Sequence, residues 1–86
     1  MSLKLKIVSP EKIEFDGYAD SVTVPGTLGA FEILENHAPI LPSLERGLLT
    51  YKSNSENHQL AILGGFVEVQ KNEVNVCVEC NSDTQQ

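Results

Sequence analysis

The chain has 86 residues, which is the length of a single domain. Its composition, 41% hydrophobic and 21% charged, is that of a globular protein and excludes a disordered chain. Six Lys and Arg against twelve Asp and Glu give a formal net charge of −6, which leaves no basic face for nucleic acid. An acidic surface favours a protein partner with basic patches. No apolar run has the length of a membrane span, so the expected compartment is the cytosol.

Apolar and polar residues alternate along most of the chain, first at residues 3–7 and again at 21–24 and 73–79. A period of two predicts half-buried strands, and many short strands predict an all-β sandwich or barrel. Asp16-Gly17 and Pro25-Gly26 are predicted turns, and Gln70-Lys71-Asn72 is a predicted hairpin turn. We expect one β domain over residues 1–80, followed by a polar tail at 81–86.

The sequence contains no recognisable catalytic constellation. No serine stands in a nucleophile elbow, and the carboxylates fall at exposed strand positions or in turns rather than in a converging pair. We therefore expect no catalytic residues, no bound cofactor and no resident metal. The residues alone therefore predict an interaction module.

Two cysteines and two histidines match the ligand count of a structural zinc site, but their spacing does not. Cys77 and Cys80 are an odd number of positions apart in a strand-like run, which places them on opposite faces. His37 and His58 are too far apart for a zinc knuckle. Two free thiols are the favoured interpretation, and a small Cys/His metal-binding or redox protein remains as an alternative.

Two glycine pairs and one histidine carry competing interpretations. The run 26–29 (G-T-L-G) reads as a tight loop between strands, in which glycine permits positive φ. Gly64-Gly65 is interpreted first as a corner or bulge and second as a close approach to a partner. His37 is interpreted as a hydrogen-bonded structural residue rather than a ligand.

Three stretches together resemble one family. They are V-S-P-E followed by F-D-G (8–17), P-G-T-L-G leading into L-E-N-H-A-P-I-L (25–41), and G-G-F-V-E-V (64–69). In order and spacing they are similar to the N-terminal domain of ATP synthase ε subunits, over nearly all of the chain. The resemblance implies a flattened β-sandwich of about ten short strands. It also implies a non-catalytic rotor subunit in the central stalk, which couples ion translocation to ATP synthesis elsewhere in the complex.

The resemblance further implies two partners, the γ subunit and the loops of the membrane-embedded c-ring. It places the chain on the cytoplasmic face of a bacterial inner membrane, as a peripheral part of the complex without lipid insertion. The residues that it assigns to the c-ring are Thr27, Leu28, Gly29, Ala30, Phe31, Glu32 and His37. Those that it assigns to γ are Ser9, Pro10, Leu60, Ile62, Gly64 and Gly65.

The chain departs from the family pattern in three respects. Glu35-Asn36 stands where many members have Pro-Gly or Pro-Asn, which makes that turn less rigid. Ala30 stands where some members have a carboxylate, so the c-ring contact is expected to be less charged. The sequence ends where the C-terminal helices of longer members begin, so we expect neither inhibition by those helices nor ATP binding, and we favour a naturally short subunit over a truncated one. A generic β-sandwich binding module is the alternative function.

Overall fold

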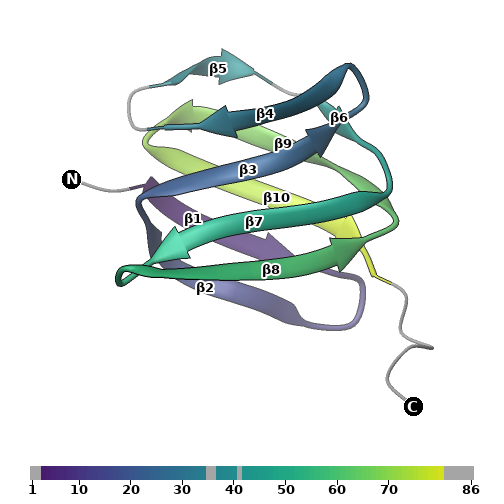
Figure 1. Ribbon diagram of the computed structural model, residues 1–86, viewed down its shortest axis with the longest axis horizontal. Helices are drawn as coiled ribbons and strands as arrows, with labels where there is room; N and C mark the ends of the chain where they lie inside the picture. Colours follow the sequence, from purple (N-terminus) through teal and green to yellow (C-terminus); the bar gives the residue numbers. More distant parts are fainter. Residues whose placement is uncertain (1–2, 35–36, 41, 81–86) are drawn as a thin grey trace.

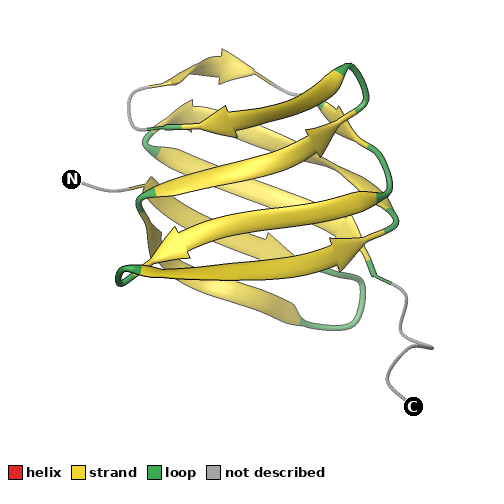
Figure 2. Cartoon of the chain, in the orientation of Figure 1, coloured by secondary structure: helices red, strands yellow, loops and turns green. Residues whose placement is uncertain are grey.

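The computed structural model describes residues 3–34, 37–40 and 42–80. Ten strands joined by short connections account for most of this part of the chain, and it contains no helix (Figure 2). Among the described residues there is accordingly no helix of the length and apolarity needed to cross a bilayer. The strands are β1 (Leu3–Val8), β2 (Ile13–Ala19), β3 (Ser21–Gly26), β4 (Gly29–Ile33), β5 (His37–Ile40), β6 (Ser43–Leu44), β7 (Gly47–Ser53), β8 (Glu56–Ile62), β9 (Gly64–Lys71) and β10 (Glu73–Glu79).

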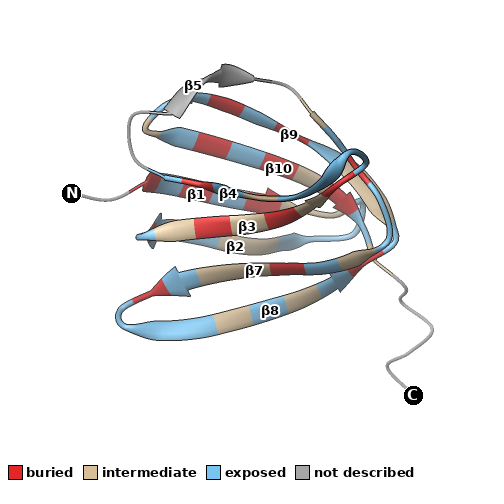
Figure 3. Cartoon of the chain, turned by 45° about the horizontal axis from the view of Figure 1, so that its top comes forward, coloured by how far each residue is buried: buried red, intermediate tan, exposed pale blue. Residues whose placement is uncertain are grey.

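The strands form one hydrogen-bonded sheet that folds over on itself. Its order is β2-β1-β10-β9-β6-β3-β7-β8, with β4 paired to β3 and β5 paired to β9. The short strand β6 joins a layer made of β2, β1, β10 and β9 to a layer made of β4, β3, β7 and β8 (Figures 1 and 3). The extents of 38 × 28 × 18 Å describe a flattened body. The predicted all-β sandwich is confirmed.

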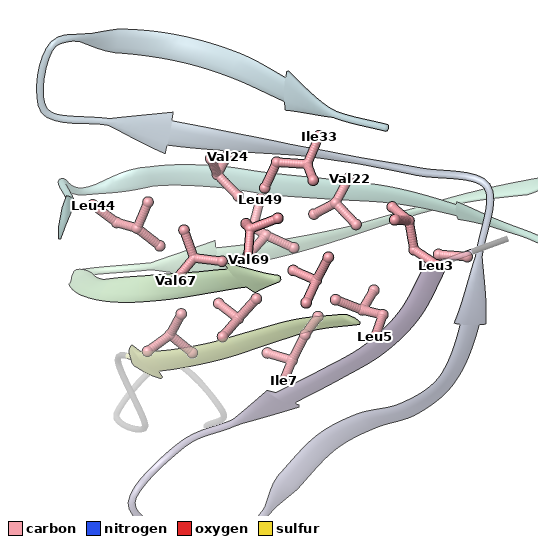
Figure 4. Packing of buried hydrophobic residues seen from close by; sticks show 14 of the residues in the cluster. Leu3, Leu5, Ile7, Val22, Val24, Ile33, Leu44, Leu49, Val67 and Val69 are labelled. Carbon is pink, nitrogen blue, oxygen red and sulfur yellow. The ribbon is translucent and has the colours of Figure 1, made fainter. Parts of the chain in front are cut away.

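The core lies between the two layers and follows directly from the alternation in the sequence. Side chains on successive strand residues point to opposite faces, so one set faces inward and the other faces solvent. Figure 3 shows this as buried and exposed bands alternating along β9 and β10. Burying each large aliphatic side chain contributes roughly 1.5–3 kcal/mol. The fully buried members include Val74 and Val76 of β10. Figure 4 labels others, namely Leu3, Leu5, Ile7, Val22, Val24, Ile33, Leu49, Val67 and Val69.

Aromatic rings close the side of the sandwich where β2 faces β7 and β8. The ring centroid of Phe15 lies 4.6 Å from that of Tyr51, and Tyr51 stacks on His58 at 5.0 Å. The Ser53 hydroxyl donates a 2.8 Å hydrogen bond to the carbonyl oxygen of Tyr18, which ties β7 to β2. These contacts hold together an edge that has no strand pairing of its own.

The hairpin turn predicted at 70–72 is confirmed, because β9 ends at Lys71 with a φ of 54° and β10 begins at Glu73. The turn predicted at Asp16-Gly17 is wrong. Both residues lie inside β2, where Asp16 pairs with Lys6 and Gly17 pairs with Leu5. A glycine fits there because the Phe15 ring covers it, and an added Cβ would lie 3.1 Å from Phe15 Cζ. The predicted tail at 81–86 lies outside the described residues.

Candidate interaction surfaces

One end of the sandwich carries several of the residues predicted to contact partners. The β1–β2, β3–β4 and β8–β9 connections and strand β6 all lie at this end, on the right of Figure 1. The β2–β3, β7–β8 and β9–β10 connections lie at the opposite end. We call the end with the β1–β2, β3–β4 and β8–β9 connections the connection end of the sandwich.

The β3–β4 turn projects a single apolar side chain from the connection end. Gly26 pairs with Gly29 across the turn, and the Leu28 side chain between them is fully exposed at 102%. Gly29 has a φ of +124°, which glycine adopts without the steric cost of a Cβ. Beside the turn is an open hollow of about 560 Å³, lined by Gly26, Thr27, Leu28, Gly29, Phe31, Pro42 and Ser43.

The structure brings together only part of the set that sequence reasoning assigned to the c-ring. Thr27, Leu28, Gly29 and Ala30 are exposed at the turn, and Phe31 is half-buried against the core. Glu32 is exposed on β4 opposite Thr23, back from the turn. The backbone of His37 pairs with Lys71 at the end of β9 remote from β6. Neither Glu32 nor the His37 backbone therefore lies at the β3–β4 turn.

Gly65 makes the β8–β9 corner possible. Its φ is +146°, and a Cβ there would overlap the carbonyl oxygen of Cys77 and lie 2.9 Å from the Val78 Cα. Only glycine therefore allows β9 to start so close to β10. At Gly64 an added Cβ would meet nothing closer than the Leu44 carbonyl oxygen at 3.6 Å. The predicted corner is thus present, and its conformational demand falls on the second glycine of the pair.

Two residues assigned to the γ contact face inward instead. Ile62 is 2% exposed and belongs to the core, so the prediction that its side chain forms part of a surface is wrong. Leu60 is half-buried and packs against the same core. Both lie on the inner face of β8 because the alternation continues in register up to the corner. Ser9 and Pro10 are half-buried and exposed, respectively, in the β1–β2 connection.

Sequence reasoning missed an apolar row on the outer face of the first layer. Val8 pairs with Ile13 on one side and with Cys77 on the other, and Cys77 pairs with Phe66. Paired residues on adjacent strands point to the same face, so the four side chains lie in one line across β2, β1, β10 and β9. Ile13 is 55% and Phe66 48% exposed. We call these four residues the apolar row.

A groove runs beside the apolar row and has a rigid lip. Its main part has a volume of about 540 Å³ and is lined by Val8, Ser9, Pro10, Gly65, Phe66, Cys77, Val78 and Glu79. A smaller hollow of about 190 Å³ shares Ser9, Pro10 and Glu79 and adds Glu11, Leu63 and Cys80. The lip is a turn in which the Ser9 amide donates to the Lys12 carbonyl at 2.9 Å. The Ser9 hydroxyl also lies 3.0 Å from Glu14 Oε2.

The outer face of the second layer has its own apolar patch at the same end. Pro25 pairs with Ala30, and Leu48 pairs with Ala61. An added Cβ at Gly47 would lie 3.0 Å from the Pro25 Cβ, which places β7 directly against Pro25. Leu48 is 53% exposed. Exposed apolar side chains are therefore present at the connection end on both outer faces.

Strand β6 links the β3–β4 turn to the groove. Leu44 pairs with Gly26 on one side and with Gly65 on the other, and Ser43 pairs with Phe66. The Thr27 amide donates to the carbonyl oxygen of Ser43 at 3.2 Å. Two residues of backbone therefore connect the turn to the groove.

The two thiols lie on opposite faces, as predicted. Both are free; Cys77 is in the apolar row, and Cys80 packs against the core just past β10. Burial is the main cause that raises the pKa of Cys80, and the carboxylates of Glu14 and Glu11 raise it further. Within the described residues, no three His, Cys, Asp or Glu side chains converge to hold a metal ion.

The fold and these surfaces define a class, namely small β-sandwich interaction domains that carry exposed apolar surface at one end. The family model for "ATP synthase, Delta/Epsilon chain, beta-sandwich domain" matches residues 2–81, and the chain belongs to this family. Among its relatives are proteins named ATP synthase epsilon chain. The one from Nostoc sp. (strain PCC 7120) is 44% identical over 80 residues, and one from Leptospira interrogans is 40% identical over 77 residues. These alignments cover 91% and 90% of the chain but only 58% and 61% of the relatives' own length.

Solved structures of similar fold come from two mitochondrial ATP synthases. A chain in the Euglena gracilis OSCP/F1/c-ring structure aligns with a TM-score of 0.84 at 19% identity, over 90% of this chain and 50% of that one. A chain in the Tetrahymena thermophila central stalk/c-ring structure aligns with a TM-score of 0.76 at 20% identity, over 92% and 64%. At these identities the likeness establishes the fold, and it agrees with the folded-over sheet described above.

Proposed function

We propose that this chain is the β-sandwich part of a non-catalytic ε-type subunit of an ATP synthase, and that it links the γ subunit to the c-ring. The observation that carries the proposal is the family match over residues 2–81, together with exposed apolar surface concentrated at one end. In this proposal the domain spans residues 1–80 and works by contact alone, without a cofactor or bound ATP. It would lie on the cytoplasmic face of a bacterial inner membrane, within the complex.

The γ contact is assigned to the groove and the apolar row. Interfaces are stabilised by a few buried aromatic or aliphatic anchors surrounded by polar residues. Phe66 fits that role, because nearly half of its surface is exposed beside a hollow large enough to admit a partner side chain. The Ser9–Lys12 turn and the Gly65 corner hold the walls of this groove in fixed positions.

The c-ring contact is assigned to the β3–β4 turn. Leu28, Gly29 and Ala30 carry no charge, so this contact would depend on shape and apolar burial. A loop that projects from a rigid sheet is suited to meeting the short polar loops of another subunit. Because β6 bonds to both surfaces, the domain would transmit torque between them without bending.

The test is size-exclusion chromatography of this chain with the γ subunit of the same organism at micromolar concentration. The expected result is co-elution as a one-to-one complex. The test variant carries Phe66→Asp, and the matched control carries Gln70→Asp, an exposed position on the same face of β9 but remote from the groove. Co-elution lost with Phe66→Asp and retained with Gln70→Asp would support the proposal. Separate elution of the folded wild-type chain and γ would withdraw it and favour a binding module for another partner.

A further inference from the structure

The groove combines an apolar floor with an acidic rim. Val8, Pro10, Phe66 and Cys77 contribute apolar surface to its main part, and Leu63 extends that surface into the smaller hollow. Phe66 and Leu63 are 48% and 40% exposed, which is costly in water unless a partner covers them.

Three carboxylates surround this floor. Glu79 lines both hollows, Glu11 lines the smaller one, and Glu14 is held beside Ser9 by the 3.0 Å hydrogen bond from the hydroxyl. Lys12, in the same turn, is the one basic residue among the charged groups that act on Cys80 there. Burial is the largest cause of the raised pKa of the Cys80 thiol, and the Glu14 and Glu11 carboxylates raise it further. The second effect agrees with a negative potential at the edge of the groove.

We propose that this groove receives a segment of the γ subunit in which one apolar side chain is flanked by Lys or Arg. The inference rests on the proposed function and adds the chemistry of the partner surface. The apolar side chain fills the floor against Phe66 and Pro10, while the flanking cations meet the rim carboxylates. Rim charge of this kind speeds association and selects the partner, and the apolar floor limits dissociation.

The arrangement does not suit the other ligands that an acidic site attracts. A hard metal ion needs several oxygen ligands converging at 2–3 Å, and the described residues contain no such group. Phosphate-bearing ligands would meet three carboxylates. A protein segment with mixed apolar and basic character is the class that satisfies both the floor and the rim.

The test is the affinity for γ at 50 mM and 200 mM NaCl, measured by surface plasmon resonance for wild type and two charge-matched variants. The rim variant carries Glu11→Gln, Glu14→Gln and Glu79→Gln. The control carries Asp20→Asn, Glu56→Gln and Glu73→Gln, which are exposed positions at the opposite end. Since rim charges act mainly on association, we expect the rim variant to lose about 10-fold in affinity at 50 mM NaCl and most of its salt dependence. The control variant should stay within about 2-fold, because its charges lie more than a Debye length away.

The outcomes distinguish the proposed groove chemistry from the proposed function. Equal behaviour of the rim and control variants, or tighter binding by the rim variant, would overturn the groove chemistry while leaving the proposed function intact. Failure of the wild-type chain to bind γ at either salt concentration would overturn both. The double variant Glu11→Gln/Glu79→Gln leaves the Ser9–Glu14 hydrogen bond in place, so it repeats the test should the triple variant be less stable.

Discussion

The two ends of the first layer's outer face differ sharply in chemistry although they lie on the same strands. At the connection end the apolar row crosses all four strands without a charge. Toward the other end, Lys4 pairs with Glu73 and Lys6 with Asp16. The alternation of inward and outward residues is the same at both ends, so folding alone does not require the difference. A surface that is apolar at one end and charged at the other agrees with the partner contact proposed for the connection end.

The largest expected effect is a difference in the free energy of unfolding between substitutions at Gly65 and Gly29, the two glycines with positive φ. Replacing Gly65 with Ala should cost about 3–5 kcal/mol, because overlap with the Cys77 carbonyl adds to backbone strain. Gly29→Ala is the matched control, since a Cβ there meets nothing within 4 Å. It should cost about 1–3 kcal/mol from strain alone. Urea unfolding followed by circular dichroism measures both, and equal losses would contradict the close approach at the corner.

The next effect concerns binding at the connection end. Phe66→Ala should weaken the complex with γ by about 10-fold, the loss typical of an interface anchor. Glu68→Ala, on the same face of β9 but in a charged row, should change affinity by less than about 2-fold because exposed charges contribute little. Isothermal titration calorimetry gives both values. A larger loss from Glu68 than from Phe66 would place the contact on the charged rows instead.

A smaller effect is expected at the β3–β4 turn. Leu28→Asp should lower binding to isolated c-rings by roughly 5-fold, since an apolar contact of about 1 kcal/mol is lost. Its unfolding midpoint should not change, because the side chain is fully exposed. Asn57→Asp introduces the same charge on β8 at the opposite end and serves as control. Pull-down of detergent-solubilised c-rings compares them, and equal retention of both variants would remove the turn from that interface.

The smallest effect is a dependence of stability on alkaline pH. Burial raises the pKa values of both Tyr51 and Cys80, with Glu14 adding to each. A raised pKa means that the folded state holds these protons after the unfolded state has released them. Stability is therefore fully present below the unfolded pKa values and declines as pH rises above about 9. The double variant Tyr51→Phe/Cys80→Ala should show a shallower decline in thermal unfolding between pH 8 and 10.5, and an unchanged slope would exclude these groups as the cause.

Much of the fold could be predicted from the sequence because alternation is a local signal. Leu3, Leu5 and Ile7 in β1 and the valines of β10 are buried as their period of two predicted. The turn predicted at Asp16-Gly17 was wrong because glycine also fits within a strand. Here the Phe15 ring occupies the space that a side chain at Gly17 would fill. Local composition does not distinguish the two cases.

The apolar row could not be predicted, because register creates it. Val8, Cys77 and Phe66 are brought together by parallel pairing of β1 with β10 and antiparallel pairing of β10 with β9. The irregularity between Ile7 and Val8 then shifts Ile13 into line. None of these pairings has a signature in the order of residues. Ile62 was misassigned for a related reason. Its position two residues before Gly64 in the sequence does not determine which face of the sheet its side chain occupies.

The pairing of the first strand with the last has a consequence for biosynthesis. β1 pairs with the adjacent β2 on one side and with β10 on the other, where Leu5 lies opposite Val74, so its second neighbour is synthesised only when the domain is nearly complete. Non-local pairings of this kind give a high contact order and slow folding. Until β10 arrives, β1 exposes an unpaired edge rich in Leu and Ile, which is a template for aggregation. A nascent chain that lacks β10 therefore exposes the edge of β1 to other chains.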